Sequence, residues 1–295
     1  MADKEDAGKP DLERLVEGID TLPTLPSIVA RVNELVQDPT TSAANLNEII
    51  SRDLALSGRL LKLVNSSMYG FPRRISSVTH AVVILGFNTV RNVVLSSFVL
   101  DAFDARDLPF GYRDFWVHSV ATATAAGALL ERQSRKEADD GFISGLLHDI
   151  GKVVLHQYAR KQFGEALKLA ESRDILLIEA EAKVFGYTHA DVGGYLLDQW
   201  HLPLHIVEAV KSHHLAGGDV AAGPDAPPLH RLGAAVHTGD IFVRALLMGS
   251  GGDSQIPSLS YRALEVLGIR QDDLPRALKT ASDKMSRIQG FLEIL

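Results

Sequence analysis

The sequence of 295 residues contains no cysteine. A disulfide framework and a thiolate-ligated metal site are therefore excluded, which fits a reducing compartment. No uninterrupted apolar stretch approaches the roughly 20 residues that a helix needs to cross a bilayer. The first ten residues, MADKEDAGKP, are charged and lack the apolar run of a signal peptide. We therefore expect a cytoplasmic protein with no membrane as a partner.

An excess of positive charge is also missing. The chain has 37 acidic and 30 basic residues and a formal net charge of −7, which argues against nucleic acid as a partner. Segments with the alternation of a β-strand are missing as well, because apolar residues recur at spacings of three and four along nearly the whole chain. This pattern predicts an all-α protein, and 46% hydrophobic residues are enough for a sizeable core.

The pattern of helices and helix breakers predicts two helical lobes. We expect a disordered tail over residues 1–10, an N-terminal lobe over 11–105 and a C-terminal lobe over 106–295. The boundary is placed at ARDLPFGYRD, because this stretch carries the breakers Pro109 and Gly111. Glycine- and proline-rich composition predicts loops at 215–228 and 249–258. The helices expected in the C-terminal lobe span residues 112–133, 139–158, 160–172, 175–186, 188–200, 203–215, 229–249, 260–267 and 272–292.

One segment of the expected C-terminal lobe carries ionisable residues among apolar ones. The apolar residues of FISGLLHDIGKVVLHQY have helical spacing, which predicts one continuous helix that contains His148, Asp149 and Lys152. A histidine and an aspartate buried side by side between apolar turns need charge compensation. Gly145 and Gly151 on either side would let an ion approach the backbone closely. The segment therefore indicates a buried ion site.

Further histidines and one aspartate lie in other expected helices of this lobe. A helical bundle can direct side chains from several helices into one interior pocket. Imidazole nitrogen and carboxylate oxygen suit iron, manganese, zinc and similar divalent ions, and paired ions can activate water and hold a phosphoryl group. Lys152 lies on the same side of its helix as His148 and Asp149 and would favour an anionic ligand such as a phosphate. The candidate residues outside the quoted segment are His118, His189, His213, His214 and Asp240.

Each candidate also has an ordinary structural explanation when it is taken alone. A single buried histidine such as His118 is more often a hydrogen-bonded core residue than a metal ligand. Asp240 alone is explained as a surface carboxylate, and Lys152 alone as a side chain whose stem packs while its amine reaches solvent. The His213-His214 pair can complement the negative end of a helix dipole. Only the adjacent histidine and aspartate of the quoted segment demand a compensating charge.

These motifs together resemble the HD superfamily of metal-dependent phosphohydrolases and, within it, the HDOD domain (HD-related output domain) of bacterial signalling proteins. The resemblance covers roughly residues 15–245. It rests on FWVHS, GLLHDIGK and three N-terminal strings that are specific to the HDOD domain: LPTLPSIVARVNELV, IISRDLALSGRLLKLVNSSMYG and ISSVTHAVVILGFNTVRNVVL. It implies that the C-terminal lobe is an HD-superfamily helical bundle with an interior metal pocket.

The resemblance also implies roles for the candidate residues. The first ion would be held by His118, His148, Asp149 and Asp240, and the second by Asp149, His189, His213 and His214. Asp149 would thus bridge a pair of divalent ions, with iron expected before manganese or zinc. Lys152 would face a phosphate, so Lys152 and Asp149 are the candidate catalytic residues.

Two functions remain open after this comparison. HDOD domains resemble regulatory output modules, many of which have lost the HD metal ligands, whereas this chain retains what resembles a complete set. The first function is a signal-transduction module with signalling proteins as partners. The second is a metal-dependent phosphohydrolase whose ligand is a phosphate-containing small molecule, either a nucleotide or a cyclic (di)nucleotide. The His-His pair lacks the Gly-Tyr-Pro turn of the HD-GYP relatives, which puts cyclic di-guanylate in doubt. A di-iron redox site is a third possibility.

Overall fold

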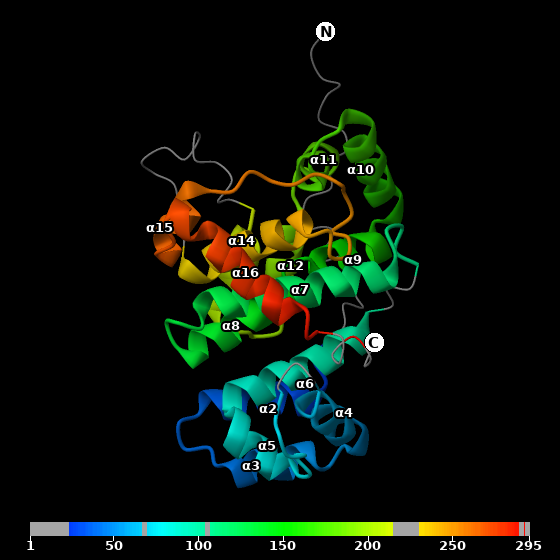
Figure 1. The fold of residues 1–295 in the computed structure, drawn as a ribbon. Helices are drawn as coiled ribbons and strands as arrows, with labels where there is room; N and C mark the ends of the chain where they lie inside the picture. Colours follow the sequence, from blue (N-terminus) through cyan, green and yellow to red (C-terminus); the bar gives the residue numbers. More distant parts are fainter. Residues whose placement is uncertain (1–23, 67–69, 104–106, 215–229, 289–291, 293–295) are drawn as a thin grey trace.

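The computed structural model describes residues 24–66, 70–103, 107–214, 230–288 and 292. The tail expected at 1–10 and the loop expected at 215–228 lie outside these ranges. Every regular element within them is a helix, so the all-α prediction is confirmed (Figure 1). None of these helices is both long and apolar enough to span a lipid bilayer.

The helices form two lobes, and Figure 1 shows the N-terminal lobe (blue to cyan) beneath the C-terminal one. The N-terminal lobe consists of α2 (Ser27–Gln37), α3 (Ala43–Ile50), α4 (Leu54–Val64), α5 (Val78–Leu85) and α6 (Phe87–Ala102). The C-terminal lobe consists of α7 (Tyr112–Leu130), α8 (Arg135–Leu147), α9 (Ile150–Tyr158), α10 (Arg160–Arg173), α11 (Leu177–Val184), α12 (His189–Gln199), α13 (Leu204–Ser212), α14 (Arg231–Ala245), α15 (Tyr261–Leu267), the 3₁₀ turn η2 (Gln271–Asp273) and α16 (Leu274–Met285). The exact lobe boundary at residues 105 and 106 stays a prediction.

Side-chain caps begin three helices of the N-terminal lobe. Ser42 and Asn45 form a capping box at the start of α3. Asp53 and Ser77 each accept a hydrogen bond from a backbone N–H in the first turn of α4 and of α5. Gly86 separates α5 from α6 with a φ of 84°, a backbone conformation that favours glycine.

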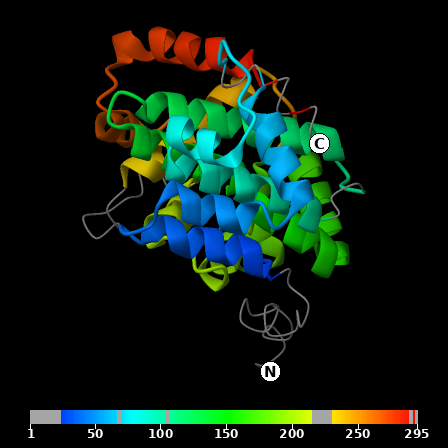
Figure 2. The same cartoon turned by 90° about the horizontal axis from the view of Figure 1, so that it is seen from below.

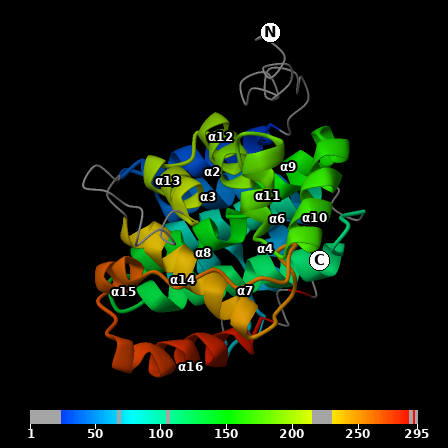
Figure 3. The ribbon, with the colours of Figure 1, turned by 90° about the horizontal axis from the view of Figure 1, so that it is seen from above.

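Helices α7 and α14 form the centre of the C-terminal lobe. Both are buried over most of their length, and alanine, serine and threonine dominate the buried part of α7. A Cβ added at Gly145 of α8 would lie 2.7 Å from the Cα of Ala123, and one at Gly239 of α14 would lie 3.1 Å from the backbone nitrogen of Ala126. Small residues therefore let α8 and α14 approach the α7 backbone directly. α16 (red) packs on the far side of α7, along one edge of the molecule (Figures 2 and 3).

The segment 142–158 does not form the single helix that its apolar spacing predicts. α8 ends at Leu147 and α9 begins at Ile150, with His148 and Asp149 in a turn between them. Asp149 has φ −98° and ψ 5°, outside the helical region. Adjacent residues on a continuous helix would diverge by about 100° around its axis. The turn instead brings the two side chains together, with His148 Nε2 3.3 Å from Asp149 Oδ2.

The glycines that flank this turn contact other helices. A Cβ at Gly151 would lie 2.0 Å from the carbonyl oxygen of His189 and 2.8 Å from the backbone nitrogen of Gly193, both in α12. Gly145 meets the backbone of α7 in the same way. The expectation that these glycines leave room for an ion beside the backbone is therefore wrong, because neighbouring helices fill that space. Their role is to bring α7 and α12 close to the α8–α9 turn.

Buried polar groups join the two lobes where α6 meets the N-terminal half of α8. Arg91 Nη2 donates a hydrogen bond to Asp140 Oδ1 at 3.0 Å. Asn92 Nδ2 donates to the carbonyl oxygen of Asp139 at 2.6 Å, and Thr89 Oγ1 donates to the carboxylate of Asp139 at 3.0 Å. Breaking a buried ion pair by removing one partner is strongly destabilising. These directional contacts fix how α6 sits on α8.

We expect Gly151→Ala to destabilise the protein by about 3 kcal/mol or more, because the added Cβ overlaps the α12 backbone and the two helices must separate. Gly164 of α10 is the matched control: nothing lies within 4 Å of its added Cβ. Alanine at that position should stabilise the protein by about 0.5–1 kcal/mol. Urea denaturation followed by circular dichroism measures both changes, and equal shifts in the two variants would contradict the packing role of Gly151.

Candidate metal centre

Four of the predicted site residues form a group that we call the first subsite. His118 comes from α7, His148 and Asp149 from the α8–α9 turn, and Asp240 from α14. His118 Nε2 lies 3.6 Å from Asp149 Oδ2 and 3.0 Å from Asp240 Oδ1. His148 Nε2 lies 3.3 Å from Asp149 Oδ2 and 3.9 Å from Asp240 Oδ1. All four residues are at most 2% exposed.

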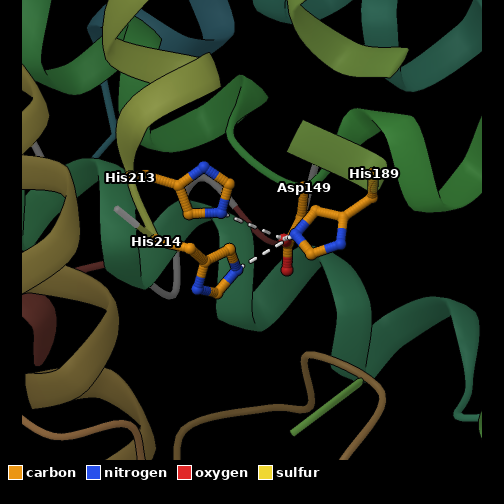
Figure 4. A group of neighbouring side chains, drawn as sticks. All are labelled: Asp149, His189, His213 and His214. Carbon is orange, nitrogen blue, oxygen red and sulfur yellow. Dashed lines mark hydrogen bonds and ion pairs between the residues drawn. The ribbon is translucent and has the colours of Figure 1, made fainter. Parts of the chain in front are cut away.

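Three further histidines face Asp149 from the other side and complete what we call the second subsite (Figure 4). His189 begins α12, and His213 and His214 follow the last residue of α13. The Nε2 atoms of His189 and His213 lie 3.2 Å and 3.8 Å from Asp149 Oδ1. His214 Nε2 lies 3.1 Å from His189 Nε2. The four potential ligand atoms of this subsite lie within 4.8 Å of one another.

Asp149 belongs to both subsites through different oxygens. Its Oδ2 faces the first subsite and its Oδ1 the second. One carboxylate can therefore serve two neighbouring cations, one on each oxygen.

The unsatisfied atoms of the site test whether it fits a cation. Four buried atoms make no hydrogen bond: Nε2 of His118, His148 and His213, and Oδ1 of Asp149. Buried polar atoms normally have a partner, so a cluster without one needs an explanation. Donors that share one ion at about 2.1 Å lie about 3.0–3.4 Å apart, close to the separations observed here. The residues fit divalent metal ions.

Hydrogen bonds at the opposite ring nitrogens aim the histidines. Nδ1 of His148 contacts the carbonyl oxygen of Gly145 at 2.7 Å, and Nδ1 of His213 contacts that of Val210 at 2.6 Å. A carbonyl oxygen accepts only, so each Nδ1 carries the proton and donates it. A neutral imidazole in this tautomer has a lone pair on Nε2, which here faces the Asp149 carboxylate. Two lone pairs that face each other at this distance need a shared proton or a metal ion between them.

Burial and neighbouring charges set the ionisation of the two carboxylates. Burial alone would raise the pKa of Asp149, but His148 and Lys152 lower that pKa well below its ordinary value. Burial likewise would raise the pKa of Asp240, and the Arg244 charge with the neighbouring His118 imidazole lowers it well below the ordinary range. Both groups are therefore carboxylates at neutral pH, the form that binds metal.

The pKa values of the histidines in the second subsite are shifted in opposite directions. Burial, followed by the charges of neighbouring histidines, lowers the pKa of His213 and of His214 well below the ordinary value. Burial acts in the same direction on His189, but the Glu181 carboxylate outweighs it and the pKa of His189 is raised. His213 and His214 therefore stay neutral and keep a lone pair for a metal at neutral pH.

Two cations hold the carboxylates of the first subsite. Lys152 is fully buried, and its Nζ donates to Asp149 Oδ2 at 2.7 Å and to the carbonyl oxygen of Gly251 at 2.7 Å. Arg244 Nε donates to both oxygens of Asp240 at 3.0 Å and 3.1 Å. The lysine is therefore beside Asp149, as its spacing predicts, but it contacts a backbone oxygen on its other side.

A cavity of about 570 Å³ adjoins the first subsite. His118 and Arg244 line it together with apolar side chains that include Phe110, Leu167 and Ile175. The cavity wall nearest to His118 is the segment 249–255, which we call the cap. The loop predicted at 249–258 is thus confirmed as non-helical, and it lies over the predicted metal ligands.

The structure brings all seven predicted ligands and Lys152 together, and their roles as ligands and as catalytic residues stay predictions. Two buried neighbours of the site, Glu181 and Arg244, were not predicted from the sequence. Glu181 is fully buried, and its Oε2 accepts hydrogen bonds from the backbone nitrogen of His189 at 2.9 Å and from His189 Nδ1 at 2.5 Å. It lies four residues after the buried Leu177, a spacing that indicates an inward position. Arg244 is four residues after Asp240, which is also a recognisable helical pair.

His237 is a buried core histidine with a hydrogen-bond partner, which is the ordinary role of a single buried histidine. Its Nδ1 contacts the carbonyl oxygen of His213 at 2.9 Å. This hydrogen bond from α14 holds the backbone of His213, a predicted metal ligand. His156 and His205 contact Asp107 and Asp140 and no residue of the two subsites in these hydrogen bonds.

Comparison with known proteins gives a family match over most of the chain. The model of the HDOD domain matches residues 22–216. An uncharacterized protein of Treponema pallidum is 27% identical over 207 residues, which are 68% of this chain and 39% of that protein. The uncharacterized protein YuxH of Bacillus subtilis is 33% identical over 78 residues, 26% of this chain and 19% of YuxH. The chain thus matches less than half the length of either curated relative.

Solved structures share the fold over nearly the whole chain. An HDOD domain protein of unknown function from Geobacter sulfurreducens has a TM-score of 0.70 at 25% identity. The match covers 96% of this chain and 94% of the Geobacter chain. A proposed phosphohydrolase from Shewanella amazonensis has a TM-score of 0.68 at 22% identity, with 95% and 96% coverage. A proposed signal transduction protein from Marinobacter aquaeolei has a TM-score of 0.74 at 23% identity and covers 95% of this chain, which spans 61% of that protein.

We expect Glu181→Ala to weaken metal binding about 10- to 100-fold, because the hydrogen bond that aims His189 at the second subsite is lost. Glu181→Gln should weaken binding less, since its amide oxygen can still accept from Nδ1. Competition titration against a chromogenic chelator measures the affinity. Glu179→Ala, at an exposed position on the same helix, is the control. Equal effects of alanine at 179 and 181 would contradict a specific role for Glu181.

Proposed function

Because the chain belongs to the HDOD domain family, we propose that it is a regulatory module of bacterial signal transduction built around a dinuclear His/Asp metal centre. The observation that carries the dinuclear proposal is the division of the Asp149 carboxylate, with one oxygen toward each subsite. The first ion would bind His118, His148, Asp149 and Asp240, and the second Asp149, His189, His213 and His214. The mixed nitrogen and oxygen donors favour iron, with manganese or zinc as alternatives.

Burial of the first subsite supports a regulatory role over open catalysis. A hydrolytic centre needs a coordination position that substrate or water can reach. The four side chains of the first subsite are almost completely buried, and Gly251 of the cap lies against His118. Ions bound in the two subsites would therefore act on the protein itself: they would join α7, α12, α13 and α14 to the α8–α9 turn and neutralise the facing carboxylates. Such a centre stabilises one arrangement of the lobe, which is what a docking surface for signalling proteins requires.

A metal-dependent phosphohydrolase is the second candidate, and the position of Lys152 favours it. When bound, the ions would supply a nucleophile from water and a clamp for a phosphoryl group. Lys152 would contribute a positive charge beside Asp149, and the adjoining cavity would accept the rest of a nucleotide. The Shewanella amazonensis protein described above carries the name of a phosphohydrolase. In the arrangement described here, however, the Lys152 ammonium is already held by two oxygens.

Metal content tests the dinuclear centre. We expect about two ions per chain in protein purified without chelator, since paired carboxylate-bridged sites hold ions together. Asp149→Ala should lose both ions because it removes the bridge, whereas His118→Ala should lose one. His80→Ala, at an exposed position far from the centre in the sequence, should retain both. Inductively coupled plasma mass spectrometry gives the ratio, and an unchanged content in Asp149→Ala would overturn the proposal.

A hydrolysis screen separates the two candidate functions. We expect the metal-loaded protein to cleave bis-p-nitrophenyl phosphate and cyclic dinucleotides no faster than Asp149→Ala does, because the first subsite is closed. Absorbance at the nitrophenolate band and chromatography of the nucleotides measure the rates. Turnover that disappears in Asp149→Ala and Lys152→Ala would favour the phosphohydrolase instead.

A further inference from the structure

The cap lies directly on the first subsite. Gly251 is buried, and a Cβ at this position would lie 2.8 Å from Arg244 Nη2 and 3.3 Å from His118 Nε2. The backbone nitrogen of Ser250 donates to the carbonyl oxygen of Asp114 at 3.0 Å, one turn before His118 on α7. Only a residue without a side chain can bring its backbone this close to the predicted metal ligands.

Both buried cations of the first subsite hold the cap as well as a metal-ligand carboxylate. Lys152 Nζ joins Asp149 Oδ2 to the Gly251 carbonyl oxygen. Arg244 joins Asp240, through Nε, to Asp253 Oδ1 at 2.9 Å and to the carbonyl oxygen of Gln255 at 3.0 Å, both through Nη1. The cap therefore supplies three oxygens, those of the Gly251 and Gln255 carbonyls and Oδ1 of Asp253, to the two cations. The other partners of these cations named above are the predicted metal ligands Asp149 and Asp240.

Asp253 anchors the cap to the rest of the lobe. Its carboxylate accepts hydrogen bonds from the backbone nitrogens of Leu177, which begins α11, at 3.1 Å and of Gln255 at 3.0 Å, in addition to its ion pair with Arg244. The Asp253 side chain is 6% exposed. A single carboxylate thus ties the cap both to α11 and to a cation of the first subsite.

The oxygens of the cap match what an external oxyanion would offer. Lysine and arginine are the residues with which proteins bind carboxylate and phosphate oxygens through charge-assisted hydrogen bonds. Buried cations need such partners, and here a carbonyl and a carboxylate of the same chain supply them. The adjoining cavity of about 570 Å³ has apolar walls from Phe110, Leu167 and Ile175, room for the body of an organic phosphate.

We propose that the cap is an internal ligand: its Gly251 carbonyl and Asp253 carboxylate occupy, on Lys152 and Arg244, the position of an external phosphate ester, so that the centre binds such an ester only when the cap is displaced. This inference rests on the metal centre proposed above and names the ligand class and the regulation of that same site. The cap, in this arrangement, keeps a complete metal centre closed until the ligand or a partner protein moves it.

Asp253→Ala tests the internal ligand, because it removes the anchor without touching a predicted metal ligand. In manganese-loaded protein, broadening of the ³¹P resonance of inorganic phosphate reports binding next to the ions. We expect the variant to bind phosphate at least about tenfold more tightly than the unchanged protein. The apparent affinity of the unchanged protein is reduced because only the fraction of molecules with a displaced cap can bind phosphate. Amide hydrogen exchange in 249–255 should rise in parallel. Ser254→Ala, exposed in the same segment, is the matched control and should change neither quantity.

Two further variants keep the test decisive. Gly251→Ala displaces the cap by a clash instead of a lost anchor and should also raise phosphate affinity, so the test survives if Asp253→Ala fails to fold. Adding Lys152→Met to Asp253→Ala should abolish the gain in phosphate affinity, because the phosphate would then lack its contact with Lys152. Faster exchange in the cap without a gain in phosphate affinity would overturn the proposal.

Ion content of the same samples separates this inference from the proposed function. Samples that retain their ions and show no gain in phosphate affinity overturn the internal ligand alone. Samples that hold no ions overturn the metal centre and, with it, the internal ligand that rests on it.

Discussion

The carboxylate of Asp149 is buried in the middle of the C-terminal lobe, and the arrangement of the surrounding helices depends on how it is compensated. An ionised carboxylate away from water is very costly unless cations and hydrogen-bond donors surround it. Lys152 reaches its Oδ2 from the next helical turn, whereas the imidazoles that face both oxygens come from α7, α12 and α13 and from the α8–α9 turn. Segments far apart in the sequence must therefore meet at this one group. Small residues and glycines at the helix contacts make the meeting possible, because they let backbones touch.

The same compensation explains why the site combines features of an enzyme and of a closed structural centre. Its donors are the mixture that divalent ions prefer, and their free lone pairs converge as ions require. Yet each cation that would assist a phosphoryl group also holds the backbone or a side chain of the cap. Chemistry on an external substrate needs those cations to be released, and regulation needs them to be held. In the regulation that we propose, the cap and not the metal ligands therefore decides between the two functions.

The all-α fold and the family follow from local signals, namely the apolar spacing and the N-terminal strings, and both were predictable from the sequence. The residues of the candidate centre could be selected because histidines are uncommon in otherwise apolar helices. The α8–α9 break could not be predicted: the apolar spacing continues through His148 and Asp149, and contacts with other helices stabilise the turn. The roles of Gly145 and Gly151 were equally inaccessible, since the backbones that they touch belong to α7 and α12. Composition marked the cap as a loop but carries no information on where a loop lies.

Within the described residues, α8 runs from the buried polar contacts of the lobe junction to the first subsite. Its N-terminal half receives Arg91 and Asn92 of the other lobe, and its last residue precedes His148 of the first subsite. From Asp140 to His148 the rise along the axis is about 12 Å, a distance over which a helix behaves as a stiff rod. Contacts with α6 at one end of α8 and the turn that carries His148 at its other end are therefore parts of one continuous rigid element. α8 thereby joins the buried junction between the lobes to the buried first subsite.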